Sequence, residues 1–194
     1  MPVTVAPATA AALEPCPSLR TRTLAAVKAV FDPHVNLVVW QRGDDEGVAR
    51  RAACWPVAVG RLMRSIAVRD LELPAVASTL SLPLESPLAA DVLLLAELFA
   101  TITGAETVGV RVDVTERATC PRFHADHVTL RLMTTYRGPG TQWLQDGRTE
   151  QAEAGDVLFA KGDLWPDLRC GPCVHRSPEP LPGQSRVLLT LDAL

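Results

Sequence analysis

Two histidines and one aspartate in the C-terminal half of the chain have the residue types and spacing of metal ligands. His124 and Asp126 are separated by one residue, and His175 follows later in the chain. Two imidazoles and one carboxylate make a 2-His-1-carboxylate set, which leaves coordination positions open and suits oxygen-activating Fe(II). The nearly alternating, β-branched run from Val128 to Tyr136 predicts a strand, on which His124 and Asp126 would share one face.

An arginine close behind the second histidine provides a candidate for binding a co-substrate. Arg186 opens the predicted strand that follows His175. Its planar guanidinium matches a carboxylate through two parallel hydrogen bonds, so it is suited to the carboxylate of a co-substrate. Thr190 lies on the same predicted strand face as Arg186, and Tyr136 ends the predicted His124 strand. Either hydroxyl could assist in binding that carboxylate.

A pair of cysteines gives a rival interpretation, a closed structural zinc site. Cys170 and Cys173 are spaced as one half of such a site. A thioredoxin-like role is disfavoured, because the prolines at 178, 180 and 182 prevent the helix that would lower the thiol pKa. The Zn(II) ligands would then be Cys120, Cys170, Cys173 and one histidine, His124 or His127.

Simpler explanations of the same residues remain open at this point. Asp126 could form a structural ion pair with Arg122 or Arg131. On a helix His124 and His127 would share a face, as in a His-x-x-His zinc pair, whereas on a strand they point apart. The β-branched run favours the strand, so His127 is expected either at the surface or as a residue that supports the metal ligands without binding the ion.

The predicted elements place these residues in the β-rich half of an α+β fold. Residues 1–18 are expected to be a flexible tail, and residues 19–194 a single domain. In that domain, residues 19–104 form a mainly helical half, packed on a C-terminal double-stranded β-helix (a cupin-like jelly roll) over 105–194. Helices are expected at 19–31, 48–68 and 87–103, with a loop at 72–87; strands are expected at 34–40, 107–115, 124–136, 141–144, 157–160, 174–177 and 186–191.

Composition limits the class of protein. The chain has 194 residues and a formal net charge of −3, without a dense basic run, so nucleic-acid binding is not expected. No apolar run approaches the ~18 residues of a transmembrane helix, so no membrane partner is expected. The five cysteines are an odd number and widely spread, which favours a reducing cytoplasm over a secreted disulfide scaffold.

The ligand motif resembles a known class of enzyme. His124-x-Asp126, His175 and Arg186 resemble, in order and rough spacing, the double-stranded β-helix oxygenases that depend on Fe(II) and 2-oxoglutarate. The segments 120–126, 136–143, 174–178 and 186–192 resemble an uncharacterised bacterial family, domain-of-unknown-function family 1826. The oxygenase resemblance implies Fe(II) and 2-oxoglutarate as cofactors. Genes of family 1826 often lie beside those of zinc-homeostasis GTPases, which implies a link to metal supply and a non-enzymatic zinc-binding protein as the alternative function.

Overall fold

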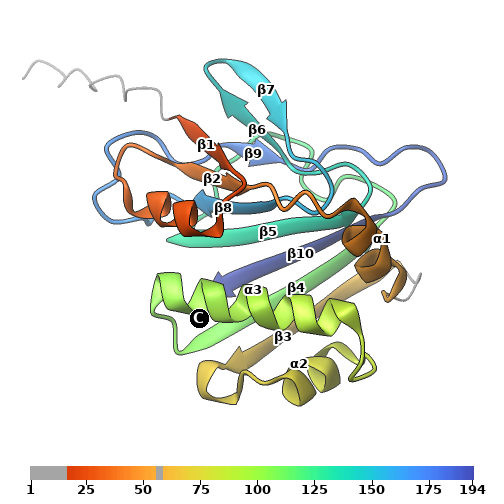
Figure 1. The fold of residues 1–194 in the computed structure, drawn as a ribbon. Coiled ribbons are helices and arrows are strands. Elements are labelled where there is room, and N and C mark those ends of the chain that lie inside the picture. Colours follow the sequence, from red (N-terminus) through yellow and green to blue (C-terminus); the bar gives the residue numbers. More distant parts are fainter. Residues whose placement is uncertain (1–16, 56–58) are drawn as a thin grey trace, which may run out of the picture.

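Two β-sheets and a layer of helices make up the part of the chain that the computed structural model describes, residues 17–55 and 59–194 (Figure 1). The strands are β1 (Ser18–Thr21), β2 (Leu37–Trp40), β3 (Gly60–Ala67), β4 (Thr107–Thr115), β5 (Leu130–Arg137), β6 (Gln142–Gln145), β7 (Arg148–Gln151), β8 (Val157–Lys161), β9 (His175–Arg176) and β10 (Arg186–Ala193). The helices are α1 (Asp45–Ala53), α2 (Leu73–Leu80) and α3 (Pro87–Thr103), with 3-10 turns η1 (Leu24–Phe31) and η2 (Val68–Asp70).

The strand orders are those of a double-stranded β-helix. The large sheet has the order β1-β2-β8-β5-β10-β4-β3, and the small sheet has the order β7-β6-β9. An isolated antiparallel bridge between His124 and His175 extends the small sheet beyond β9. The four strands β8-β5-β10-β4 and these four small-sheet segments form the two faces of an eight-strand jelly roll. The predicted β-helix is therefore present.

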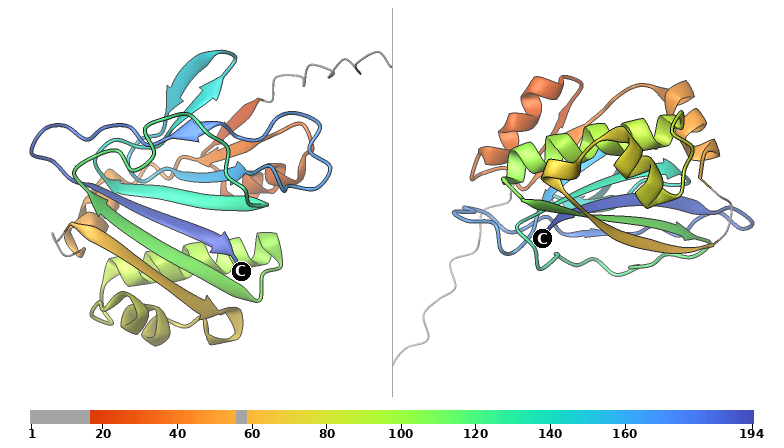
Figure 2. Two further views of the ribbon diagram at one scale, coloured as in Figure 1. Left: turned by 180° about the vertical axis from the view of Figure 1, so that it is seen from behind. Right: turned by 90° about the horizontal axis from the view of Figure 1, so that it is seen from below.

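Alternating side chains on the large sheet fill two separate cores. On one face Leu132 of β5 and Leu189 of β10 pack with Val92 and Phe99 of α3. On the other face Met133 packs with residues of the small sheet and its flanking loops, such as Trp143 and Cys173. Figure 2 shows α2 and α3 together on one side of the large sheet. The helices thus cover one face of the sheet and leave the other face to form the interior of the barrel.

Helix α3 is the helical element that the sequence predicts best. Pro87 occupies its first turn, where no amide hydrogen is needed, and Gly104 ends it with a positive φ of 67°. Ser86 occupies the N-cap position, although its side chain makes no capping hydrogen bond. No helix among the described residues is long and apolar enough to cross a membrane.

The N-terminal half is less helical than predicted. Strand β1 replaces the start of the helix expected at 19–31, and β3 replaces the second part of the helix expected at 48–68. Leu62 and Ile66, four residues apart, fit a helical stripe and also one face of a strand, so their spacing cannot decide between the two. These residues form a strand because they pair with β4. Conversely, α2 forms where a loop was expected, and the predicted tail lies, apart from residues 17 and 18, outside the described residues.

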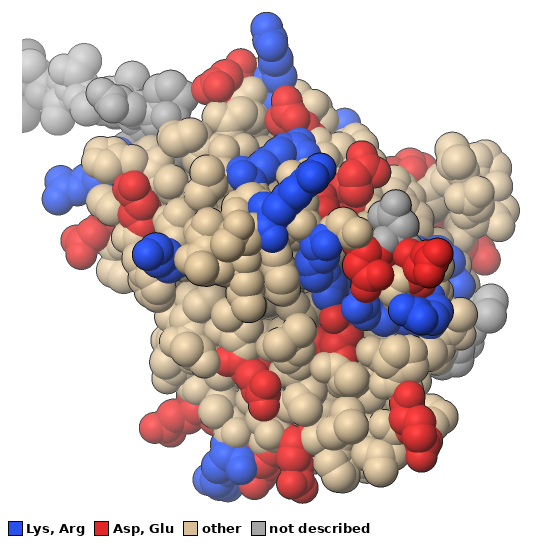
Figure 3. Space-filling view, viewed as in Figure 1, with Lys and Arg blue, Asp and Glu red and all other residues tan. Residues whose placement is uncertain are grey.

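A buried carboxylate joins α3 to the large sheet. Asp91 accepts a hydrogen bond of 2.6 Å from Arg42 Nη1 and one of 2.7 Å from the Tyr136 hydroxyl. Burial and the Asp91 charge raise the pKa of Tyr136 well above its usual value, so the phenol remains a donor. On the surface above, acidic and basic side chains lie close together around α1, where Arg51 pairs with Asp44 (Figure 3).

Replacing Asp91 by alanine should lower the free energy of unfolding by about 3–5 kcal/mol, because it leaves the charge of Arg42 buried without its partner. Urea denaturation followed by circular dichroism measures the change. Glu97→Ala is the control, since Glu97 is exposed on the same helix; it should change stability by less than about 0.5 kcal/mol. Equal stability of the two variants would show that the buried pair contributes nothing.

Candidate metal centre

The fold brings His124, Asp126 and His175 together at one end of the barrel. One donor atom from each residue lies within 4.8 Å of the others. His175 Nε2 is 3.2 Å from Asp126 Oδ2, and His124 Nε2 is 3.6 Å from Asp126 Oδ1. Ligand bonds of about 2.1 Å place neighbouring donor atoms about 3.0–3.4 Å apart around one ion. The separations of this group are therefore close to those of a metal ligand set.

Both histidines direct the same nitrogen toward the carboxylate. His124 Nδ1 lies 3.0 Å from the carbonyl oxygen of Arg122, and His175 Nδ1 lies 3.3 Å from the carbonyl oxygen of Cys173. Since a carbonyl only accepts, each Nδ1 carries a proton, and in the neutral form of the ring each Nε2 presents its lone pair toward Asp126. The buried Oδ2 of Asp126 has no hydrogen-bond partner among the described residues. In this form the group presents three lone-pair donors to a single cation.

Asp126 and His124 lie in a loop, and the prediction that they belong to a strand is wrong. Strand β5 begins only at Leu130, and His124 takes part in the single bridge to His175. That bridge consists of two backbone hydrogen bonds of 2.9 and 3.0 Å, which fix His124 beside His175. Farther along, the loop packs against Gly162, where a Cβ atom would collide with the carbonyl oxygens of Asp126 and Val128. The bridge and this close approach position the loop.

An arginine fixes the orientation of the carboxylate. Arg131 Nη1 lies 2.8 Å from Asp126 Oδ1, and the Nε and Nη2 atoms of the same guanidinium donate to Asp192 at 2.7 and 2.9 Å. The structural ion pair between Asp126 and Arg131 therefore exists alongside the His–Asp–His group. It occupies Oδ1 and leaves Oδ2 for an ion.

The charges around Asp126 keep it ionised. Burial alone would raise its pKa, but the neighbouring side chains of His175, Arg131 and His124 lower the pKa to about 2. The carboxylate is therefore negative at neutral pH, which is the protonation state that a metal ligand requires.

The three residues border a cavity of about 240 Å³ between the two sheets. Its wall also includes Arg111 and Leu188 from the large sheet, and Thr141 and Ser177 from the small-sheet side. This volume lies just below the about 300–1,000 Å³ of pockets for drug-sized ligands, so the cavity suits a smaller molecule.

Arg186 lies behind that wall as a buried cation. Its guanidinium donates to Thr135 Oγ1, Thr141 Oγ1, Ser177 Oγ and the Pro139 carbonyl at 2.8–3.2 Å. All four acceptors are neutral, and no described acidic side chain pairs with it. Burial lowers the pKa of Arg186 to about 10, although the charge of Asp113 raises it, so the guanidinium still carries its charge at neutral pH. A buried, uncompensated guanidinium beside a cavity is suited to an anionic ligand.

Of the two hydroxyls predicted to assist Arg186, Tyr136 lies on the wrong face of the sheet. Tyr136 belongs to the core under α3 and bonds Asp91, whereas its neighbour Thr135 contacts Arg186. Thr190 does lie on the barrel side, where it accepts a hydrogen bond of 3.2 Å from Arg111 Nη2.

The alternative zinc ligands do not form a group among the described residues. His127 is largely exposed and bonds Asp163, and Cys170 contacts the Pro33 carbonyl. Cys173 is buried in the barrel core, where burial, together with the Asp126 charge, raises its thiol pKa to about 12. Cys120 borders the cavity beside His124. The only group of three or more potential ligands in the described chain is His124, Asp126 and His175.

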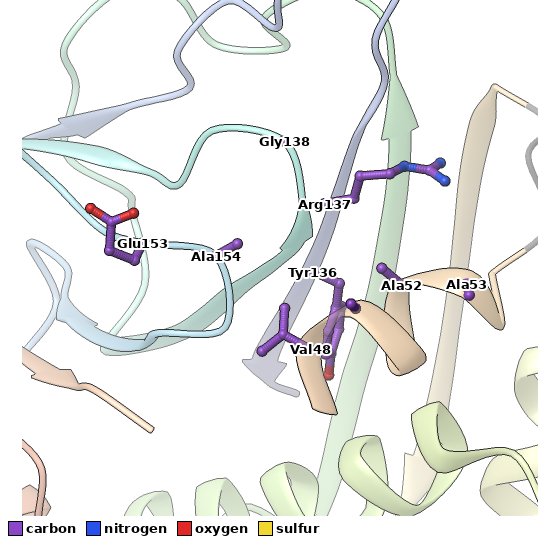
Figure 4. Close-up of a pocket in the computed structure, with 9 residues that line it drawn as sticks. Val48, Ala52, Ala53, Tyr136, Arg137, Gly138, Glu153 and Ala154 are labelled. Atoms are coloured by element: carbon purple, nitrogen blue, oxygen red, sulfur yellow. The ribbon is translucent and has the colours of Figure 1, made fainter. Parts of the chain in front are cut away.

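A larger pocket, of about 860 Å³, lies away from this centre. It is lined by α1, the end of β5 and the turn at 153–154, and none of the three candidate ligands borders it. Figure 4 shows Tyr136 against α1, with the charged groups of Arg137 and Glu153 pointing away from each other. Nothing in this pocket gathers chemically reactive groups, so the smaller cavity is the candidate site.

Residues that the sequence did not assign to the site include Asp192, Thr135, Thr141, Ser177 and Arg111. Their polarity within apolar strands is a signal for some of them. Thr135 and Asp192 are polar positions in mostly buried strands, and Arg111 alternates with the buried valines of β4. Without the register of the strands, that signal does not say which cavity they face.

Solved structures with this fold include enzymes of the oxygenase class. JOX2 in complex with 2-oxoglutarate, Fe and JA has a TM-score of 0.58 at 9% identity, covering 91% of this chain and 74% of that one. A full-length protein from Neurospora crassa, solved in complex with alpha-KG, has a TM-score of 0.51 at 15% identity, covering 92% and 84%. A prolyl-4-hydroxylase from Pseudomonas putida has a TM-score of 0.50 at 15% identity, covering 89% and 99%. At these identities the likeness establishes the fold.

Comparison of the sequence with curated proteins finds no match. A family model matches residues 21–192, which is most of the chain and includes the whole candidate site. The chain belongs to the family described as "Protein of unknown function (DUF1826)".

Proposed function

We propose that this protein is an oxygenase that depends on Fe(II) and 2-oxoglutarate, with His124, Asp126 and His175 as the metal ligands. The observation that carries the proposal is the buried Asp126 Oδ2, which has no hydrogen-bond partner among the described residues and lies 3.2 Å from His175 Nε2. An unpartnered buried carboxylate oxygen is costly unless a cation occupies the space beside it. Zn(II) would also accept these donors, but the set leaves the open positions typical of Fe(II) oxygenase sites.

Each residue has a defined role in this arrangement. The two Nε2 atoms and Oδ2 would hold the ion, while the backbone carbonyls at Nδ1 keep both imidazoles in the required tautomer. Arg186 would bind the far carboxylate of 2-oxoglutarate, with Thr135 and Thr141 keeping its guanidinium in place. Bound Fe(II) would supply the redox chemistry by which dioxygen oxidises 2-oxoglutarate and a primary substrate. The apolar barrel core beside the cavity would exclude water.

An anaerobic titration tests the proposal. Fe(II)-loaded protein is titrated with 2-oxoglutarate while the visible spectrum is recorded. A metal-to-ligand charge-transfer band that saturates at one equivalent supports chelation of the co-substrate at the metal. Stoichiometric metal without any such band would contradict the oxygenase proposal and favour a metal-binding protein without this activity.

Arg131 is expected to control metal affinity through Asp126. Changing Arg131 to glutamine removes the group that fixes Oδ1, so Asp126 can rotate away from the two imidazoles. Loss of an outer partner of a metal ligand costs about 10- to 100-fold in metal affinity. Competition with a chelator, using Co(II) as the metal, measures this loss, and the Co(II) absorption spectrum should change shape as well.

Arg61→Gln is the matched control for Arg131. Arg61 pairs with Asp113 on the same face of the large sheet, but it does not contact the three ligands. Its removal should leave the Co(II) spectrum unchanged. If both variants bind Co(II) with the affinity and spectrum of the unchanged protein, Arg131 is only a structural ion-pair partner.

A further inference from the structure

We propose that the primary substrate is a small molecule carrying a carboxylate, and that Arg111 binds this group. The inference rests on the proposed oxygenase function and specifies its substrate class. Arg111 lies in the middle of β4, and its side chain borders the cavity that His124, Asp126 and His175 also border. Its side chain is 26% exposed, so an entering molecule can reach it.

The cavity wall has an excess of positive charge. It includes three arginines, Arg111, Arg131 and Arg176, and a single acidic residue, Asp126. Of these arginines, only Arg131 pairs with carboxylates that no other arginine contacts, namely those of Asp126 and Asp192.

Arg111 shares its one carboxylate with another arginine. Asp113 accepts a hydrogen bond from Arg61 through Oδ1 and lies 3.2 Å from Arg111 through Oδ2. Two guanidinium groups therefore face one carboxylate on the barrel side of β3 and β4. One positive charge at this position has no counter-charge among the described residues.

The hydrogen-bonding capacity of Arg111 is also incompletely used. Its Nη2 atom donates to Thr190 at 3.2 Å, and its buried Nε atom lies 3.2 Å from Asp113 Oδ2 without acceptable hydrogen-bond geometry. In Arg131 the equivalent Nε and Nη2 atoms both donate hydrogen bonds to Asp192, at 2.7 and 2.9 Å. A carboxylate entering the cavity would supply the acceptors and the negative charge that Arg111 lacks.

The other cavity cations are less suited to the substrate. Arg176 is held by Gln142 Oε1 at 2.8 Å, and its guanidinium lies 4.4 Å from the centre of the Phe123 ring. Arg186 is the residue proposed to bind the far carboxylate of 2-oxoglutarate, so it is not available to the primary substrate. Arg131 is fully paired. Arg111 is thus the accessible cation with unfilled hydrogen-bonding capacity on the large-sheet wall of the metal-bearing cavity.

A neutral substrate analogue should bind worse than the acid. A hydrogen bond between charged groups contributes about 1.5–3 kcal/mol, which corresponds to roughly 10- to 100-fold in affinity. The probes are acetate, benzoate and phenylacetate, each compared with its primary amide, which has the same shape without the charge. Binding to the anaerobic Fe(II)-loaded protein at saturating 2-oxoglutarate is measured by ligand-observed NMR.

At least one acid is expected to bind 10-fold or more tightly than its amide without reducing the 2-oxoglutarate charge-transfer band, as the strength of a charged hydrogen bond requires. Arg111→Gln should remove this preference and keep the band. Arg64→Gln is the control of equal charge change, since Arg64 is exposed on β3 and does not border the cavity; it should keep the preference.

Three outcomes would overturn the inference while the oxygenase proposal stands. The first is a normal band with no acid bound in preference to its amide, and the second is an acid preference that survives in Arg111→Gln. The third is an acid that lowers the band, because such an acid competes with 2-oxoglutarate. Absence of the band in the unchanged protein is a separate result, which contradicts the oxygenase proposal itself.

Discussion

Replacing Asp126 by alanine is expected to abolish stoichiometric Fe(II) binding. The substitution removes the charged ligand and the unpartnered Oδ2 that lies 3.2 Å from His175 Nε2. Since losing an outer partner alone costs about 10- to 100-fold in metal affinity, losing the ligand should cost more than about 100-fold. Metal content after desalting and a chelator competition measure the loss, and the 2-oxoglutarate band should disappear with the metal.

The fold should survive this substitution. Arg131 keeps its two hydrogen bonds to Asp192, so no unpaired buried cation is left behind. Asp163→Ala is the matched control, because Asp163 pairs with the exposed His127 on the same side of the barrel and should be dispensable. Thermal melts of both variants separate unfolding from ligand loss. A folded Asp126→Ala protein that still retains one equivalent of Fe(II) would rule out the proposed ligand set.

Replacing Arg186 by glutamine should weaken 2-oxoglutarate binding while sparing the metal. The guanidinium supplies the charge for the far carboxylate, and it makes no contact with the three candidate ligands. Loss of a charged hydrogen bond of about 1.5–3 kcal/mol corresponds to roughly 10- to 100-fold in affinity. The charge-transfer titration gives the 2-oxoglutarate dissociation constant, and metal analysis gives the Fe(II) content of the same sample.

Two further variants distinguish binding from folding. Arg186→Lys keeps the charge but loses the planar fork, so an intermediate affinity is expected. Thr141→Val leaves the charge in place and removes one of the hydrogen bonds that orient it, so its effect should be smaller. Arg64→Gln is the surface control, since Arg64 is exposed on β3 and does not border the cavity. An unchanged 2-oxoglutarate affinity in folded Arg186→Gln would remove Arg186 from this role.

The sequence alone predicted the elements that carry strong local signals. Helix α3 has a proline in its first turn and a glycine at its end, and β4 alternates over its whole length. The separate short strands of the C-terminal half predicted the jelly roll. The candidate residues His124, Asp126, His175 and Arg186 follow from residue type and order, because a metal site needs these side chains wherever the chain places them.

The sequence could not show which residues of a strand face the barrel and which face the helices. Counting alternate residues from Asp126 into β5 places Tyr136 on the ligand face, but residues 125–129 lie in a loop and break the alternation. As a result Thr135, together with Arg131 and Met133, faces the barrel, and Tyr136 faces α3. A shift of one residue exchanges the two faces of a strand, so the error reverses the role of adjacent side chains.

Residue types and their order thus determined the candidate chemistry and the class of fold, because ligand groups and strong local patterns are properties of the chain itself. Tertiary structure decided which neighbours complete the site. Asp192 reaches Arg131 only because β10 pairs with β5, and Arg111 reaches the cavity only because β4 pairs with β10. These contacts join residues far apart in sequence. Their existence depends on strand pairing and register, which no local pattern encodes.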